Sequence, residues 1–183
     1  MRILPAFLLI AVISSCGSEQ DERELAPKGA TTAFGSVEEV RQYMDGIDPY
    51  IVQVSSIHQK IYSAVGTSSI ATGENLTKVI EEIGAIAKMN NLIEGFNKIK
   101  PPALLAPLHR DIEKLMVLRA DSYSLATRGW GLEGDEKGME LYQQSEEKLK
   151  QANALSLELN NQLADVNKAL QTAAQNQQQA SSE

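Results

Sequence analysis

The stretch VEEVRQYMDGIDPYIVQVSSIHQKIYSAV (residues 37–65) carries the hydrophobic pattern that predicts the fold. Apolar side chains and one histidine alternate at spacings of three and four residues, at Val37, Val40, Met44, Ile47, Ile51, Val54, His58, Ile61 and Val65. This spacing places them in one stripe along an α-helix. Ser36 and Glu39 form a capping box at its start. We therefore expect a helix from residue 37 to Gly66, kinked near residues 46–48 because Pro49 removes a backbone hydrogen bond.

Three further stripes of the same spacing follow, over residues 75–99, 103–129 and 135–174. Pro101 and Pro102 end the first of these, and Gly129 suits a left-handed residue that ends the second. Short connections between helices favour antiparallel neighbours. The sequence thus predicts an all-α fold, an up-down antiparallel four-helix bundle over residues 37–174. Its last helix would be about 60 Å long at about 1.5 Å per residue, so its end should protrude.

The segments that flank this domain lack helical periodicity. Residues 17–36 mix Gly, Ser, Pro and charged side chains, and about 20 residues of such a chain span ~25 Å on average. We interpret residues 16–36 as a flexible tether that begins at Cys16. The Gln-rich residues 175–183 are expected to form a disordered tail.

The first 15 residues have the order of a secretory signal. Arg2 precedes an apolar run over residues 3–13, and small residues follow. The run covers only about 16 Å as a helix, against the ~30 Å of a bilayer core, which disfavours a transmembrane span. Residues 1–15 are therefore predicted to be a signal peptide.

At the end of this run, Ile13-Ser14-Ser15-Cys16 resembles the lipobox of bacterial lipoproteins. The resemblance implies cleavage before Cys16 and lipid attachment to it. Gly17 is not the aspartate that retains lipoproteins in the inner membrane, which implies transport to the periplasmic face of the outer membrane if the organism has one. A triacylated cysteine anchors firmly, because a single acyl chain binds membranes only marginally. The alternative is an ordinary signal peptide that contains a cysteine, but Cys16 is the only cysteine and has no intramolecular disulfide partner.

A second resemblance covers the centre of the chain. Pro101-Pro102, the leucines after them, His109, and the glycines and aspartate around Asp135 are similar to the central hairpin of uncharacterised exported helical-bundle proteins of bacteria. This resemblance implies a fold and no activity.

Charge and composition narrow the classes of partner. The formal net charge is −7, and it becomes −8 once Arg2 is removed with the signal peptide. An acidic chain is a poor ligand for nucleic acid or for anionic lipid headgroups, which attract basic surfaces. We expect the membrane, through the lipid anchor, and a protein in the envelope as partners, and no nucleic acid.

The sequence contains no motif for a cofactor or for catalysis. One cysteine excludes thioether-linked haem and a structural zinc site with several thiolates. No Asp or Glu lies three residues before either histidine, so the Glu-x-x-His pairs of carboxylate-bridged metal sites are absent. Nucleophile elbows, phosphate loops and dinucleotide fingerprints are also absent from the sequence. We expect no enzyme, no metal site and no cofactor.

The two histidines are the remaining candidates for a site. His58 lies on the hydrophobic stripe, so it is expected to be partly buried and hydrogen-bonded to a neighbouring helix, with ligand binding or pH sensing as the alternative. His109 has Glu113 four residues later and is interpreted as a surface or capping pair.

Two weaker patterns have structural explanations. Glu133, Asp135 and Glu136 suggest a calcium loop but lack its register, so an acidic helix N-terminus is preferred. A further group of aromatic residues would line a pocket between helices, although such residues more often form core. The members of this group are Tyr62, Tyr123, Trp130 and Tyr142.

Two hypotheses for function follow. The first is a non-enzymatic, membrane-anchored lipoprotein that serves as a structural or interaction module at the cell envelope. The second is a binding module that holds a small apolar ligand or a metal between helices near His58.

Overall fold

The computed structural model describes residues 30–66, 73–132 and 134–180, which form a mostly helical protein. Within these residues five α-helices follow a short hairpin, and η1 (Ala103–Leu105) is a single 3₁₀ turn. The five α-helices are α1 (Val37–Gly66), α2 (Gly73–Glu82), α3 (Ala85–Phe96), α4 (Ala106–Trp130) and α5 (Glu136–Ala180). The all-α prediction is confirmed, and the described residues contain five α-helices where the sequence predicts four. Residues 1–29, which include the predicted signal peptide and Cys16, lie outside the described residues.

The last part of the predicted tether is ordered as a hairpin. Strands β1 (Thr31–Thr32) and β2 (Gly35–Ser36) pair antiparallel, and the Thr32 hydroxyl donates to the Gly35 carbonyl at 3.0 Å. Phe34, at the tip, packs against the core. The packing of this partly buried ring explains why the tether interpretation is wrong for residues 30–36.

Helix α1 begins and ends where the sequence predicts. The Glu39 amide donates to Ser36 Oγ at 3.2 Å, which confirms Ser36 as the N-terminal cap. The helix continues through Pro49 without a break in its assignment. Pro49 and Asp45 are exposed, so water can bind the carbonyl that lacks an amide partner. The kink near residues 46–48 stays a prediction.

The predicted second helix is divided at Gly84 into α2 and α3. Gly84 adopts φ 61° and ψ 39°, the left-handed conformation that glycine accepts most readily. The break also shifts the phase of burial: Ile80 is buried before it, and Ala85 and Met89 are buried after it. A single helix over residues 75–99 would have placed Ala87 on the buried face, but Ala87 is exposed.

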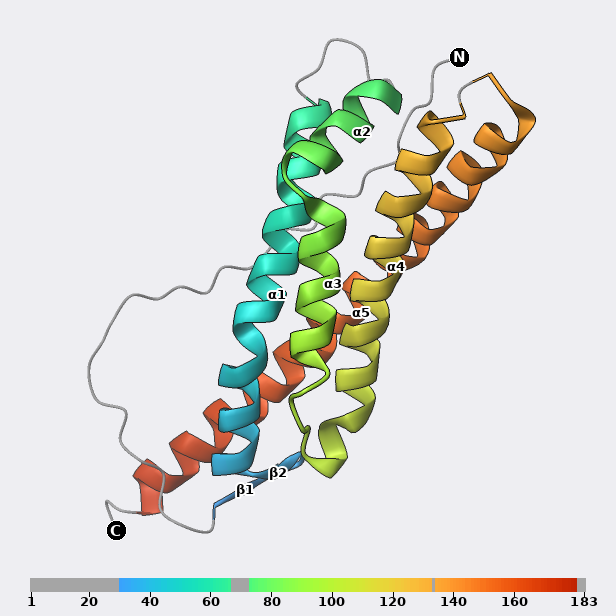
Figure 1. Cartoon of the computed structure of the whole chain (residues 1–183). Helices are drawn as coiled ribbons and strands as arrows, with labels where there is room; N and C mark the ends of the chain where they lie inside the picture. The colour runs from blue at the N-terminus through green and yellow to red at the C-terminus, as the bar shows by residue number, and fades with distance from the viewer. Residues whose placement is uncertain (1–29, 67–72, 133, 181–183) are drawn as a thin grey trace.

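Helix α4 lies at the centre of the packing and contacts α2, α3 and α5 (Figure 1). Because it is covered on more than one side, it buries polar residues outside the predicted stripe, notably His109 and Arg119. The expected left-handed cap at Gly129 is wrong. Gly129 lies inside α4, and the glycine with positive φ in this turn is Gly134.

Helices α4 and α5 make the most extensive contact in the molecule and approach closely at two glycines. A Cβ atom on Gly129 would lie 3.1 Å from the Gly138 carbonyl oxygen, and one on Gly138 would lie 3.0 Å from the Gly129 carbonyl oxygen. Small residues are thus required at the end of α4 and the start of α5, where the two helices first meet.

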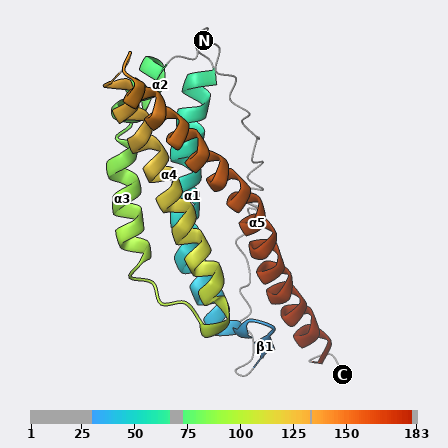
Figure 2. The same ribbon diagram turned by 90° about the vertical axis from the view of Figure 1, so that its right-hand side faces the viewer.

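The predicted stripe on the last helix is confirmed, because buried residues recur along α5 as far as Val166. The C-terminal half of α5 diverges from α4 and contacts β1 and α1 (Figure 2). The disordered tail is wrong for residues 175–180, which continue the helix to Ala180. Residues 181–183 lie outside the described residues.

Candidate functional site

His58 joins α1 to α4 through a hydrogen bond. Its Nδ1 lies 3.1 Å from the hydroxyl oxygen of Tyr123, which is 4% exposed. The expected hydrogen bond from His58 to a neighbouring helix is therefore present. Sequence reasoning placed Tyr123 only in an aromatic group and did not find it as this partner.

Arg119 lies one helical turn before Tyr123 and is 3% exposed. Its Nη2 donates to Ser156 Oγ of α5 at 3.2 Å, and its Nε has no acceptor. None of the ion pairs between described residues includes Arg119. Sequence reasoning missed this residue, although its position three residues before Ser122 on the α4 stripe was a signal.

Burial determines the protonation of this cluster, which we define as His58, Arg119, Tyr123 and Ser156. Burial first, and the charge of Arg119 second, lower the pKa of His58 to about 3. Burial raises the pKa of Tyr123 to about 12, although Arg119 acts in the opposite direction. At neutral pH the histidine is therefore neutral, the tyrosine is protonated, and the guanidinium carries the cluster's only charge.

His109 is not the surface residue that the sequence predicted. It is 8% exposed, and its ring stacks on Phe96 of α3 with centroids 4.2 Å apart and planes 12° from parallel. Its Nδ1 lies 3.3 Å from the hydroxyl oxygen of Tyr43 of α1. Burial lowers the pKa of His109, and the nearby Glu113 carboxylate opposes this effect. His109 is buried because α3 covers the face of α4 that carries it.

The two histidines thus make reciprocal bridges between the same two helices. Helix α1 supplies Tyr43 at one level and His58 at the other, while α4 supplies His109 and Tyr123. Fifteen residues on α1 and fourteen on α4 separate the two levels, so the bridges lie about 21 Å apart at 1.5 Å per residue. Two bridges at matched spacing define the register of α1 on α4.

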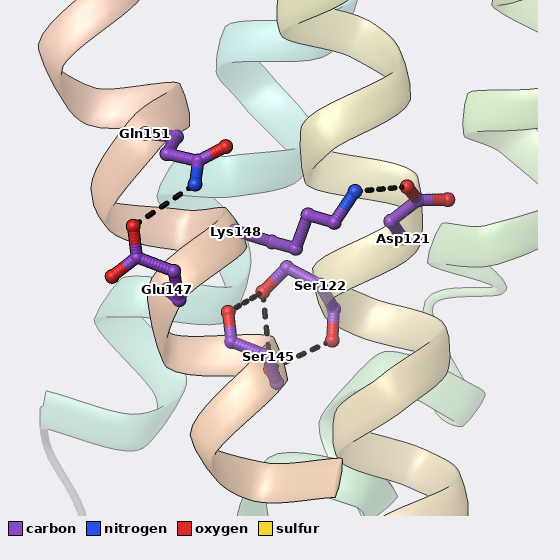
Figure 3. A network of polar contacts seen from close by, with 6 residues as sticks. All are labelled: Asp121, Ser122, Ser145, Glu147, Lys148 and Gln151. Atoms are coloured by element: carbon purple, nitrogen blue, oxygen red, sulfur yellow. Dashed lines mark hydrogen bonds and ion pairs between the residues drawn. The ribbon is translucent and has the colours of Figure 1, made fainter.

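A second polar group joins α4 to α5 (Figure 3). Ser122 Oγ donates to the Ser145 carbonyl oxygen at 3.0 Å, and Ser145 Oγ donates to the Ser122 carbonyl oxygen at 2.8 Å. Beside them, Lys148 Nζ lies 3.0 Å from Asp121 Oδ2 at a half-exposed position. The serine pair is fully satisfied and offers no free group to a ligand.

The other sequence candidates have structural roles where they are described. Asp135 accepts a hydrogen bond from the Lys137 amide at 3.0 Å and so caps α5, while Glu133 lies outside the described residues. Trp130 and Tyr142 pack closely on Gly73, where a Cβ atom would lie 3.1 Å from the Trp130 ring. Among the described residues, no group of three or more His, Cys, Asp or Glu side chains is arranged to hold a metal ion.

Two depressions are lined by residues of α1, and neither includes His58. The first, of about 480 Å³, is lined by Ser56, Lys60 and their neighbours on α1. The second, of about 380 Å³, lies between α1 and α3 and adds Lys88 and Leu92. Both are open to solvent, whereas His58 faces α4.

No helix within the described parts of the chain combines the length and apolar character needed to cross a bilayer. Comparison of the sequence with protein-family models and curated proteins, and of the structure with solved structures, gives no significant match.

Proposed function

We propose that the protein is a bacterial lipoprotein, anchored through Cys16 to the outer membrane and facing the periplasm. Its helical domain then serves as a non-enzymatic structural or interaction module. The observation that carries this proposal is Ile13-Ser14-Ser15-Cys16 at the end of an apolar run too short to span a bilayer.

The arrangement of the helices suits attachment at one end. The hairpin, which follows the anchor segment in sequence, lies at the end of the molecule where α1 begins, and α5 finishes near it (Figures 1 and 2). The turn between α4 and α5 lies at the opposite end and exposes Leu132 and Met139, at 42% and 46%. A domain tethered through Ala30 would therefore direct this turn away from the membrane.

Metabolic labelling with radioactive fatty acid tests the anchor. The wild-type chain should incorporate label and fractionate with membranes, and Cys16→Ala should lose both properties. Ser18→Ala, two residues beyond the cleavage position, is the matched control and should behave as wild type. Label that persists in Cys16→Ala would refute the lipoprotein proposal.

Site-specific crosslinking tests the interaction role. A photoreactive residue at the exposed positions Asn160 or Asn167 samples the C-terminal half of α5, which diverges from α4, and one at Glu94 of α3 is a control on another face. A partner that crosslinks through α5 but not through Glu94 supports the proposal. Multiple-turnover hydrolase or transferase activity that His58→Ala abolishes would contradict a non-enzymatic role.

A second candidate is a binding module for a small apolar ligand or a metal near His58. The observation in its favour is the partly buried, neutral histidine beside Tyr123 and Arg119. Native mass spectrometry of the protein purified from its own host, and thermal melts with metals and lipids, test it. Absence of both a retained ligand and a thermal shift rules this candidate out.

We also propose that the fold is an up-down four-helix bundle in which α2 and α3 together form one of the four helical segments. Helices α2 and α3 follow each other along one side of α1, separated only by Ile83 and Gly84. Their combined length of 22 residues is close to the 25 residues of α4, which supports their assignment as one segment of the bundle.

A further inference from the structure

Arg119 is a buried cation without an anionic partner. Only 3% of its surface is exposed, its one hydrogen bond goes to the neutral Ser156, and its Nε has no acceptor. Burial lowers the pKa of Arg119, Tyr123 opposes this effect, and the Tyr123 phenol is protonated at neutral pH. A buried charge is costly unless it is paired, and removing one partner of a buried pair is strongly destabilising.

The groups around this guanidinium cannot neutralise it. His58 is neutral and already hydrogen-bonded to Tyr123. Ser122 and Ser145 satisfy each other, and the nearest carboxylate in sequence, Asp121, pairs with Lys148. The cluster therefore has a net positive charge and several hydroxyl donors but no anionic acceptor.

We propose that Arg119 binds a small monovalent anion between α4 and α5. Nη2 is directed to Ser156, and the unpaired Nε provides a further donor for an anion. Arg119 is 3% exposed and lines neither of the two depressions described above, so the anion that we assign to it is small. Chloride and formate share the required chemistry, one negative charge and acceptor capacity without bulk.

The position of this site links the bound anion to the packing of α5 on α4. Ser145, Ala152 and Ser156 are the small residues that α5 buries before the larger Leu159. Ser156 is the α5 residue that Arg119 contacts, so an anion held there stabilises α5 on α4. This inference does not depend on the lipid anchor, because every residue in it belongs to the helical domain.

Thermal unfolding of the full chain in detergent, with chloride replacing gluconate at constant ionic strength, tests the proposal. A ligand that binds only the folded state raises stability by mass action. The wild-type melting temperature should therefore rise by several degrees with chloride, and again when formate replaces gluconate. Arg119→Met, which keeps an unbranched side chain that reaches about as far as Nε and removes the charged guanidinium, should show no rise.

Lys148→Met is the matched control, since it removes a half-exposed cation from the same interface and should keep the chloride response. Chloride-35 NMR of the wild type provides a readout that needs no variant: the protein should broaden the chloride line, and bromide should reverse the broadening. A chloride response that Arg119→Met retains, or a wild type without line broadening, would overturn the proposal. A response to chloride but not to formate would restrict the site to halides.

Discussion

Ser122 of α4 and Ser145 of α5 each donate a hydrogen bond to the backbone carbonyl oxygen of the other, at 3.0 and 2.8 Å. Their hydroxyl oxygens are 3.1 Å apart, so the two helices approach closely at this level. The backbone carbonyls involved already accept helical bonds, and the serines use their remaining acceptor capacity. The pair thus joins two backbones directly, without long side chains.

Removing one serine of this pair should destabilise the protein measurably. Ser122→Ala and Ser145→Ala are each expected to cost about 1 kcal/mol, because each deletes one buried hydrogen bond. The double variant should cost less than the sum, since the hydroxyls also contact each other. Urea denaturation measures these values. Ser124→Ala on the same helix is the control, and strict additivity in the double variant would contradict a coupled pair.

Two glycines should respond oppositely to the same substitution. Gly138→Ala should destabilise the protein by about 2 kcal/mol, because its Cβ atom would collide with the backbone carbonyls of Leu132 and Gly129. Gly46 lies inside α1 with nothing within 4 Å of a Cβ atom, so Gly46→Ala should stabilise by about 1 kcal/mol. Thermal melts of the two variants provide the comparison. Equal changes in melting temperature in the two variants would show that α4 and α5 are not closely packed at Gly138.

The break between α2 and α3 should depend on a left-handed residue. Gly84→Ala is expected to lose about 1 kcal/mol, because φ 61° is strained for alanine even though a Cβ atom meets nothing there. Gly84→Asn should lose less, since asparagine tolerates this conformation better. Urea denaturation of both variants tests the order. If alanine is the more stable of the two, the residues can join into one helix and the division at Gly84 is not required.

Acid should destabilise the protein through its histidines. The folded-state pKa of His58 is about 3, below its ordinary value of 6.5, and that of His109 is also lowered. The unfolded chain therefore binds protons that the folded chain does not bind, so stability is full above pH 6.5 and falls as pH decreases toward 3. His58, whose pKa is strongly shifted, contributes a slope of up to about 1.4 kcal/mol per pH unit, and His109 acts in the same direction.

Glutamine variants separate this effect from the titration of carboxylates. The free energy of unfolding, measured between pH 7 and pH 5, should fall less steeply in His58→Gln than in wild type, and least in the double variant with His109→Gln. Glutamine keeps a neutral hydrogen-bonding group next to each tyrosine. An unchanged slope in the double variant would refute the role of buried neutral histidines.

Helix positions follow from hydrophobic spacing, because one side of a helix must face the core. The stripes predicted for α1 and α5 match the buried residues, and the Ser36 cap and the start of α5 near Asp135 follow from side chains that bond to nearby amides. A capping hydrogen bond joins residues only a few positions apart, so it can be recognised in the sequence. His58 belongs to this group, since its place on a stripe implied a partner on another helix.

The packing of the helices determines features that hydrophobic periodicity does not predict. The left-handed turn at Gly84 and the burial of Arg119 and His109 depend on which helices cover α4, and this is a relation between segments far apart in the chain. An arginine next to a hydrophobic stripe can extend to water or be enclosed by a neighbouring helix, and only the approach of α5 selects between these outcomes. The unpaired guanidinium therefore becomes visible only when α4 and α5 are brought together.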